Sequence, residues 1–208
     1  MTAVSRIVLL DTGIGNIQSV ANVLEYIGAH FWVSDKIEDL SKADKIIFPG
    51  VGTYGNAIKR MKEKGLFEPL KHAMNVDQKP SLGICVGMQV LSEIGYEFGE
   101  HQGLGIIPGS VKRLQTADRK LRLPHVGWND VSLNKDSALF KDIEQGASFY
   151  FLHSYYFEPS DRSNISCTVD YGQRFTAAIE RGNVFGVQFH PEKSQGPGIQ
   201  LFKNFVEM

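Results

Sequence analysis

The sequence predicts an α/β fold in which a mostly parallel central sheet is flanked by helices and continues into a β-rich second half. Up to Gly95, short apolar runs alternate with stretches of helical periodicity, the pattern of a sheet covered on both faces. Beyond Gly95 the runs become short and β-like, with turn residues between them. Apolar residues make up 42% of the 208 residues and no Pro/Ser-rich linker divides them, so we expect one domain over 1–208.

The strands of the first half are apolar runs that stop at turn residues. They are expected at 6–10, 30–33, 45–48 and 81–84. In the first helix Ile17, Val20, Leu24 and Ile27 share one face, and Gly28 ends it. Helices are expected at 16–27, 55–64, 67–75 and 86–94.

The second half has seven short β-like runs and a final helix. The runs lie at 103–109, 111–114, 131–133, 148–152, 165–169, 177–180 and 184–189. The final helix is expected at 198–206. A chain that changes in this way from strand–helix alternation to successive strands predicts a β-rich continuation of the same domain.

Composition argues against several classes of protein. The formal net charge of −1 does not favour nucleic acid or an anionic membrane as the main partner. No stretch approaches the ~20 apolar residues that span a bilayer, and the first apolar run is too short for a secretory signal. Cys85 and Cys167 stand in unrelated contexts and form no CxxC pair, so we expect a reducing, cytoplasmic setting.

A cysteine between two glycines marks the candidate nucleophile. The order strand, Gly83-Ile-Cys85-Val-Gly87, helix is the pattern of a nucleophile elbow, in which glycines allow a sharp turn and the side chain is exposed at the strand end. A helix N-terminus beneath the sulfur favours the thiolate. The alternative is a buried, unreactive cysteine. Cys167 alternates inside an apolar strand, and we expect it to serve packing only.

His190 is the strongest candidate for the base that a catalytic cysteine needs. It ends an apolar run and is followed by Pro191 and Glu192. Pro191 favours extended backbone at His190, and residues i and i+2 of an extended chain point to the same side. Glu192 can therefore stay beside the imidazole, which predicts a Cys85–His190–Glu192 triad. A simple turn is the alternative explanation of this His-Pro-Glu stretch.

Several motifs in sequence order carry a resemblance to a known family. They are Asp11-Thr-Gly-Ile-Gly-Asn16, Pro49-Gly-Val-Gly52, Gly83-Ile-Cys-Val-Gly-Met-Gln89, Gly103-Leu-Gly-Ile-Ile-Pro-Gly109, Pro124-His-Val-Gly-Trp-Asn129, Tyr150-Phe-Leu-His-Ser-Tyr155 and His190-Pro-Glu-Lys-Ser194. The chain resembles the class I (triad) glutamine amidotransferases, whose fold is flavodoxin-like. Over its whole length it resembles their HisH type, the glutaminase subunits of imidazole glycerol phosphate synthase.

The resemblance implies a reaction and a partner. Glutamine is hydrolysed to glutamate and ammonia through a γ-glutamyl thioester on Cys85. The ammonia passes to a HisF-type (β/α)8-barrel cyclase subunit in a heterodimer. There it reacts with a phosphoribulosyl-formimino-AICAR ribonucleotide to give imidazole glycerol phosphate and AICAR in histidine biosynthesis. No metal and no organic cofactor is implied.

The resemblance also implies roles for individual residues. The oxyanion would be bound by the N–H of Val86 and, depending on a peptide flip, that of Val51 or Gly52. Glutamine would be held by Gly50, Gln89, Glu97, His153, Ser154 and Tyr155. The cyclase subunit would face Asn16, Trp128, Tyr150 and Lys193.

The chain departs from the family in two places, and other functions stay open. Val86 stands where many members have Leu, and the segment 92–99, which contains Glu97, differs in detail. A HisH-like paralogue that supplies ammonia to a nucleotide-sugar amidotransferase would use the same residues. A catalytically silent docking subunit and an α/β domain without chemistry are further alternatives, against which the intact triad argues. A stand-alone cysteine hydrolase is another alternative, against which the absence of papain-like signatures and of a secretory context argues.

Overall fold

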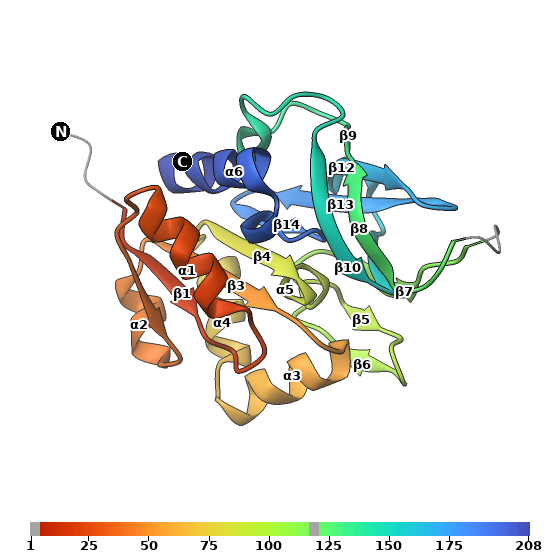
Figure 1. Ribbon diagram of the computed structural model, residues 1–208. Coiled ribbons are helices and arrows are strands. Elements are labelled where there is room, and N and C mark those ends of the chain that lie inside the picture. Colours follow the sequence, from red (N-terminus) through yellow and green to blue (C-terminus); the bar gives the residue numbers. More distant parts are fainter. Residues whose placement is uncertain (1–4, 117–120) are drawn as a thin grey trace.

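A single eight-stranded sheet runs through the computed structural model, which describes residues 5–116 and 121–208 (Figure 1). The strand order is β2-β1-β3-β4-β14-β13-β12-β9. Its first five strands are parallel: β2 (Phe31–Ser34), β1 (Ile7–Leu10), β3 (Lys45–Gly50), β4 (Ser81–Cys85) and β14 (Val184–Val187). The remaining three are antiparallel: β13 (Arg174–Arg181), β12 (Ile165–Asp170) and β9 (Ser132–Leu133). The predicted mostly parallel sheet is confirmed.

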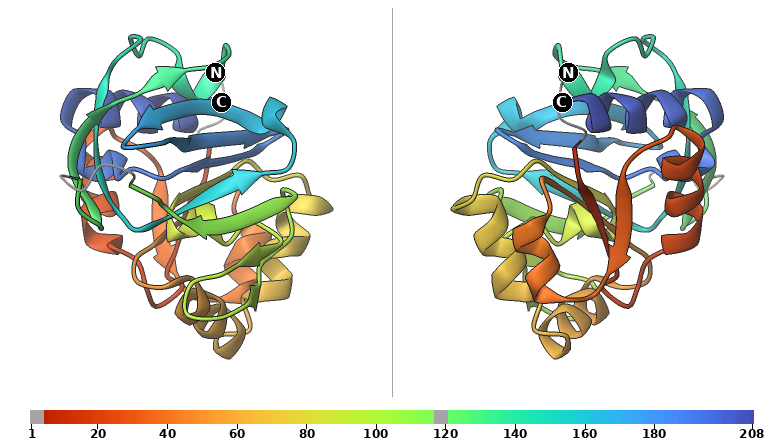
Figure 2. Two further views of the ribbon diagram at one scale, coloured as in Figure 1. Left: turned by 90° about the vertical axis from the view of Figure 1, so that its right-hand side faces the viewer. Right: turned by 90° about the vertical axis from the view of Figure 1, so that its left-hand side faces the viewer.

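The helices form two groups on opposite faces of this sheet (Figures 1 and 2). On one face α1 (Ile17–Tyr26) packs against α6 (Gln195–Glu207). On the other, α2 (Ile37–Lys42) and α3 (Tyr54–Glu63) pack against α4 (Phe67–Asn75). Right-handed crossovers require this arrangement, because the chain moves from β1 outward to β2 and then back to β3 and β4.

Two smaller sheets occupy the second half. The first has the order β11-β7-β5-β6, with β11 (Tyr155–Pro159), β7 (Gly109–Arg113), β5 (Ile94–Gly95) and β6 (His101–Gln102). The second pairs β10 (Ser148–His153) with β8 (His125–Asp130). Short 3-10 turns complete the fold: η1 (Ala138–Phe140), η2 (Arg162–Asn164) and η3 (Pro191–Lys193).

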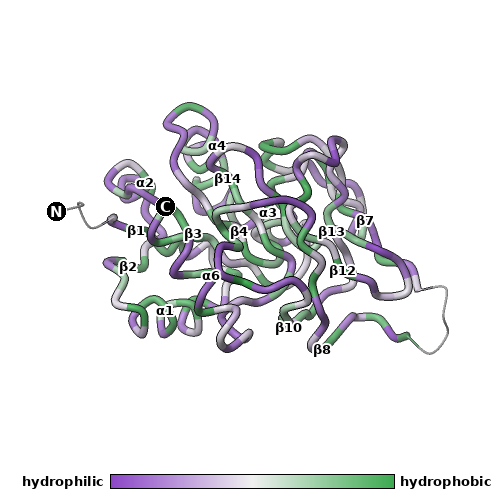
Figure 3. The backbone as a smooth tube through the Cα atoms, turned by 90° about the horizontal axis from the view of Figure 1, so that it is seen from above, coloured by the Kyte–Doolittle hydropathy of each residue, from purple (hydrophilic) through white to green (hydrophobic). Residues whose placement is uncertain are grey.

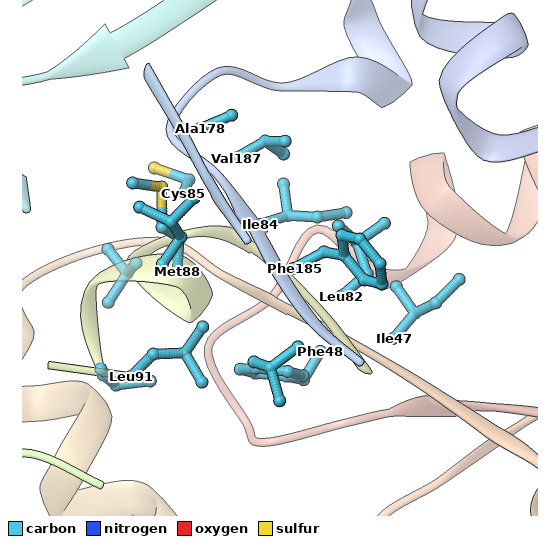
Figure 4. Close-up of a cluster of buried hydrophobic side chains, with 14 of the residues drawn as sticks. Ile47, Phe48, Leu82, Ile84, Cys85, Met88, Leu91, Ala178, Phe185 and Val187 are labelled. Atoms are coloured by element: carbon cyan, nitrogen blue, oxygen red, sulfur yellow. The ribbon is translucent and has the colours of Figure 1, made fainter. Parts of the chain in front are cut away.

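Burial explains why the inner strands carry continuous apolar runs. Every residue of β1, β3, β4 and β14 is buried, as expected for parallel strands covered on both faces. Hydrophobic stretches accordingly run through the middle of the molecule (Figure 3). Around the end of β4, Phe48, Ile84, Met88 and Val187 pack together, with Cys85 at the border of the cluster (Figure 4).

Two expectations about individual elements were wrong, and helix α2 and strands β6, β8 and β11 were not expected. The helix expected at 86–94 is the single turn α5 (Val86–Gln89), because the chain turns at Ser92 and Ile94 joins a strand. The run 103–109 is a loop up to the start of β7, and its N–H groups bond to carbonyls of 90–93. Helix α2 was missed, since only Leu40 of its six residues is buried and it shows little periodicity. In the described parts of the chain, no helix has both the length and the apolarity to cross a membrane.

Candidate active site

The turn from β4 into α5 presents Cys85 in a strained conformation. Cys85 has φ 55° and ψ −111°, a region that costs an L-residue energy and recurs at functional sites. The two flanking glycines make the turn sterically possible. A Cβ on Gly87 would lie 2.1 Å from the carbonyl oxygen of Phe48, and one on Gly83 would lie 2.6 Å from that of Gly87. The elbow therefore requires glycine at both positions.

His190 follows β14, the neighbour of β4 in the sheet. The parallel register sets Val187 beside Ile84, so both strands deliver their next residues to the same edge. Imidazole Nδ1 of His190 lies 2.8 Å from Oε1 of Glu192, and the two side chains are 3% and 1% exposed. An ionised carboxylate only accepts, so Nδ1 carries the proton and Nε2 is left for other partners.

Two neighbours of His190 favour its charged form. Burial by itself would lower the pKa of His190, but hydrogen bonds to Cys85 and Glu192 raise it above the usual range. Both partners can carry negative charge, and they act on the imidazolium in a site that is largely closed to water. This arrangement favours proton transfer from Cys85 to His190, the first requirement for a nucleophilic cysteine.

A cavity of about 220 Å³ opens over the cysteine. It is lined by Val51, Gly52, Cys85, Val86, Gln89, Glu97, Pro124, Leu152, His153, Ser154, Tyr155 and His190. Ten of these twelve residues are among those predicted for the site; Pro124 and Leu152 were not. Two predicted residues are absent from the lining: Glu192 stands behind His190, and Gly50 pairs with Cys85 across β3 and β4.

Comparison with known proteins agrees with this geometry. The sequence profile of the family "Glutamine amidotransferase class-I" matches residues 8–208. The chain belongs to this family. An "Imidazole glycerol phosphate synthase subunit HisH" of Acinetobacter baylyi is 46% identical over 204 residues, 98% of each chain. "Subunit HisH 1" of Campylobacter jejuni strain RM1221 is 43% identical over 202 residues, 97% of this chain and 100% of its own length. "Subunit HisH 2" of Pseudomonas aeruginosa PAO1 is 44% identical over 202 residues, 97% of this chain and 99% of its own.

Solved structures share the fold at lower sequence identity. A structure titled "Crystal structure of glutamine amidotransferase" has a TM-score of 0.75 at 19% identity, over 96% of this chain and 97% of its own. The structure of PurLQS from Thermotoga maritima has a TM-score of 0.71 at 22% identity, over 98% of both chains. Both likenesses support the class I amidotransferase fold, as the sequence predicted.

In this class I amidotransferase, the loop after β3 borders the cavity next to α5. The Val51 N–H donates to the carbonyl oxygen of Ile14 at 2.5 Å. This N–H is thus committed to the loop that precedes α1. Gly52 has φ 100°, and a Cβ there would meet open space. Gly50 needs to be glycine for a different reason, since its Cβ would lie 2.8 Å from the Gly87 nitrogen.

Two polar side chains that line the cavity, those of Glu97 and Gln89, form hydrogen bonds with backbone groups. Oε2 of Glu97 accepts the Tyr54 N–H at 2.7 Å, and burial raises the pKa of this carboxyl. Nε2 of Gln89 donates to the Tyr155 carbonyl at 2.9 Å. His153 is buried, and burial lowers its pKa to about 3, so that its imidazole is neutral near pH 7.

Three of the four residues predicted to face a partner lie together. The rings of Trp128 and Tyr150, on paired strands, have centroids 6.2 Å apart. Lys193 Nζ lies 5.6 Å from the Tyr150 ring. Trp128 is 48% exposed and is therefore not a core residue. Asn16 precedes α1, a helix that packs against η3, and makes no side-chain capping bond.

One buried polar residue beside the nucleophile was missed by sequence reasoning. Gln188 is fully buried, and its Nε2 lies 3.7 Å from Cys85 Sγ. The sequence contains a signal for this residue, because Gln188 is a polar residue within an apolar run and stands two residues before His190. Among residues 5–116 and 121–208, no cluster of three or more His, Cys, Asp or Glu side chains could hold a metal ion.

Proposed function

We propose that this chain is the glutaminase subunit of imidazole glycerol phosphate synthase and works in the cytoplasm. It hydrolyses glutamine and passes ammonia to a HisF-type (β/α)8-barrel cyclase for histidine biosynthesis. The observation that carries the proposal is Cys85 at φ 55° beside the buried His190–Glu192 pair. It occurs in a chain 43–46% identical over nearly full length to proteins named as HisH subunits.

The chemistry follows from the three triad residues. The Cys85 thiolate attacks the side-chain amide carbon of glutamine, and the carbonyl oxygen becomes an oxyanion. His190, protonated by the cysteine, gives its proton to the departing nitrogen, so ammonia leaves and a γ-glutamyl thioester remains. His190 then takes a proton from water, whose oxygen attacks the thioester and releases glutamate and the thiol. Glu192 keeps the Nδ1 proton in place throughout.

Two backbone N–H groups complete the oxyanion site in this proposal. The Val86 N–H follows the cysteine directly and supplies one donor. The second comes either from Val51, after rotation of the Gly50–Val51 peptide breaks the 2.5 Å bond from its N–H to the Ile14 carbonyl, or from Gly52, after rotation of the Val51–Gly52 peptide. The positive φ of Gly52 makes such a rotation sterically inexpensive. Docking of the cyclase subunit against the loop is the event that we expect to drive it.

The remaining lining residues bind the amino-acid end of glutamine. Backbone groups of His153, Ser154 and Tyr155 hold its α-amino and α-carboxylate groups, and Gln89 and Glu97 supply side-chain contacts. Anchors remote from the reacting amide fix its position over the thiolate and lower the entropic part of the barrier. The cyclase subunit contacts Asn16, Trp128, Tyr150 and Lys193.

A related function differs only in where the ammonia goes. The relatives from C. jejuni and P. aeruginosa carry the numbers 1 and 2 in their names, which points to more than one such subunit in those species. In this alternative the chain uses the same triad but supplies its ammonia to a nucleotide-sugar amidotransferase. Neighbouring genes for histidine synthesis or for sugar modification distinguish the two.

Glutamate release from glutamine tests the proposal. The purified chain is assayed alone, with a HisF-type cyclase, and with the cyclase and its ribonucleotide ligand. We expect little release from the chain alone and strong stimulation by both additions. Glutamate release that does not change when the cyclase is added would favour the sugar-amidating paralogue. No release under any condition would favour the silent docking subunit.

A further inference from the structure

A row of hydrogen-bonding side chains leads from Asn129 on β8 through His125 and His153 to Tyr155, which lines the cavity. Asn129 Nδ2 donates to the Asp170 carbonyl at 3.1 Å and lies 3.4 Å from His125 Nε2. His125 Nδ1 lies 3.2 Å from His153 Nε2, and His153 Nδ1 lies 2.9 Å from the Tyr155 carbonyl oxygen. Both histidines are buried.

Elementary hydrogen-bond chemistry assigns every proton in this row. The Tyr155 carbonyl only accepts, so His153 carries its proton on Nδ1 and accepts at Nε2. His125 therefore carries its proton on Nδ1 and accepts at Nε2 from Asn129. Burial lowers the pKa of His125 to about 4 and that of His153 to about 3, so both are neutral near pH 7, as the row requires.

A second row leads from the same carbonyl to the nucleophile. Gln89 Nε2 donates to the Tyr155 oxygen at 2.9 Å and, with its other hydrogen, to Gln188 Oε1 at 3.0 Å. Gln188 must then present its Nε2 to Cys85, and that nitrogen lies 3.7 Å from Sγ. A reversed Gln188 amide would set two donors against each other at Gln89. The acceptor-only carbonyl thus fixes which end of Gln188 faces the sulfur.

We propose that Gln188 is a further catalytic residue, an N–H donor that stabilises the Cys85 thiolate. His125, His153 and Gln89 are positioning residues that hold the Tyr155 carbonyl and, through it, the Gln188 amide. This inference rests on the proposed role of Cys85 as the nucleophile. A donor to a buried anion stabilises it far more than a donor in water, because no solvent competes.

The position of Asn129 places one end of this row next to the proposed cyclase interface. It follows Trp128 on β8, so the row starts beside the aromatic pair that we assign to the cyclase interface. A shift of β8 on docking would reach the Tyr155 carbonyl through two histidines that are both confined by packing. His125 stacks on Tyr171 with ring centroids 4.0 Å apart and on Phe151 at 5.0 Å.

Alkylation of Cys85 tests the role of Gln188 without glutamine or partner. The full chain is treated with iodoacetamide between pH 6 and pH 10, and the rate is followed by mass spectrometry. Gln188→Leu removes the donor, and we expect alkylation at pH 7 to slow about tenfold, with the pH midpoint moved upward. Gln188→Glu sets a carboxylate against the sulfur and moves the midpoint further. Gln200→Leu, on α6, is the matched control and should leave the curve unchanged.

The histidine row has its own variants. His125→Phe keeps an aromatic ring on Tyr171 but removes the donor to His153, and we expect alkylation to slow about threefold. His125→Asn retains an N–H near the position of Nδ1 and should restore part of the rate. Tyr171→Phe keeps the stacking partner and should leave the rate unchanged.

Distinct outcomes separate the inference from the proposed function. Thermal unfolding followed by circular dichroism verifies that each variant is folded, and if Gln188→Leu does not fold, Gln188→Glu decides. Wild-type alkylation curves in the folded Gln188 variants would overturn the role of Gln188, whatever the glutaminase assay shows. If alkylation slows in the Gln188 variants but keeps its wild-type rate in His125→Phe, the positioning role of the histidines is overturned. Absence of glutamate release, with the alkylation shifts present, would instead count against the proposed function.

Discussion

Two buried cysteines in this chain have opposite surroundings. Cys85 has a positive φ and faces His190 and Gln188, groups that can stabilise a thiolate. Cys167 lies inside β12, is fully buried, and burial raises the pKa of its thiol well above the usual range. Residue type and burial alone do not separate the two thiols, whereas backbone conformation and neighbours do.

We predict that Cys85→Ser lowers glutamate release at least about 10⁴-fold, because the hydroxyl is a far weaker nucleophile beside the same base. The assay is glutamate release in the presence of the cyclase subunit and its ligand. Cys167→Ala serves as the control and should keep nearly full activity. Comparable losses in both variants would contradict the assignment of Cys85.

The neutral, buried histidines predict a stability that depends on pH. The folded-state pKa values of His125 and His153 lie at about 4 and about 3, below the unfolded value near 6.5. The unfolded chain therefore binds more protons than the folded chain in this window. The free energy of unfolding falls as pH drops from about 6.5 to about 4.5, by up to ~1.4 kcal/mol per pH unit for each histidine.

Urea unfolding at several pH values measures this slope. His125→Asn should flatten it, because one of the two titrating groups is gone. His72→Asn changes a histidine whose side chain is 62% exposed and should leave the slope as in the wild type. An equal slope in wild type and His125→Asn would show that other groups cause the loss of stability.

At the scale of elements, the elbow depends on close approach between β4, α5 and β3. Gly50, Gly83 and Gly87 each stand where a Cβ would lie less than 3.0 Å from backbone. These contacts bring the turn of α5 against β3 and hold Cys85 in its strained conformation. A strained nucleophile persists only because its surroundings allow no relaxation.

We predict that Gly87→Ala destabilises the chain by about 1–3 kcal/mol and abolishes activity, since its Cβ would lie 2.1 Å from the Phe48 oxygen. Urea unfolding and glutamate release measure the two effects. Gly196→Ala lies in the first turn of α6, where a Cβ meets nothing within 4 Å, and should be neutral or slightly stabilising. A fully active Gly87→Ala would contradict the close approach.

At the scale of the molecule, the outward face of the β8–β10 pair is unusually apolar. Val126, Trp128 and Leu152 are 54%, 48% and 41% exposed, and Tyr150 packs edge-on against Trp128. The face adjoins the cavity, since Leu152 lines it and its carbonyl lies 4.0 Å from Cys85 Sγ. An exposed aromatic group beside the site where ammonia forms suits a docked subunit that receives it.

We predict that Trp128→Ala weakens binding of the cyclase subunit about 30-fold or more, with the thermal midpoint of the free chain nearly unchanged. Isothermal titration calorimetry measures the affinity and circular dichroism the midpoint. Tyr26→Ala is the matched control, because Tyr26 is an aromatic residue 76% exposed at the far end of α1. Equal losses in the two variants would contradict the assigned face.

Local patterns were sufficient to predict much of the sheet. The helix at 67–75 has the predicted bounds, and β3 and β4 begin at the predicted residues, because their burial on both faces leaves uninterrupted apolar runs. The helix after Cys85 was predicted too long for the same reason. The residues after Gln89 are largely apolar, but they form a turn and the short strand β5 instead of continuing the helix.

Local sequence was enough to propose the triad, since a cysteine between glycines and a His-Pro-Glu stretch are local features whose chemistry needs few neighbours. The alternation of strands and helices also predicted a mostly parallel sheet. The face that Trp128 occupies, the direction of the Val51 N–H and the surroundings of the Cys85 sulfur are known only from the folded structure. Those properties depend on contacts between segments far apart in the chain, such as Gln188 with Gln89 and His125 with His153. Periodicity along the sequence does not predict such contacts.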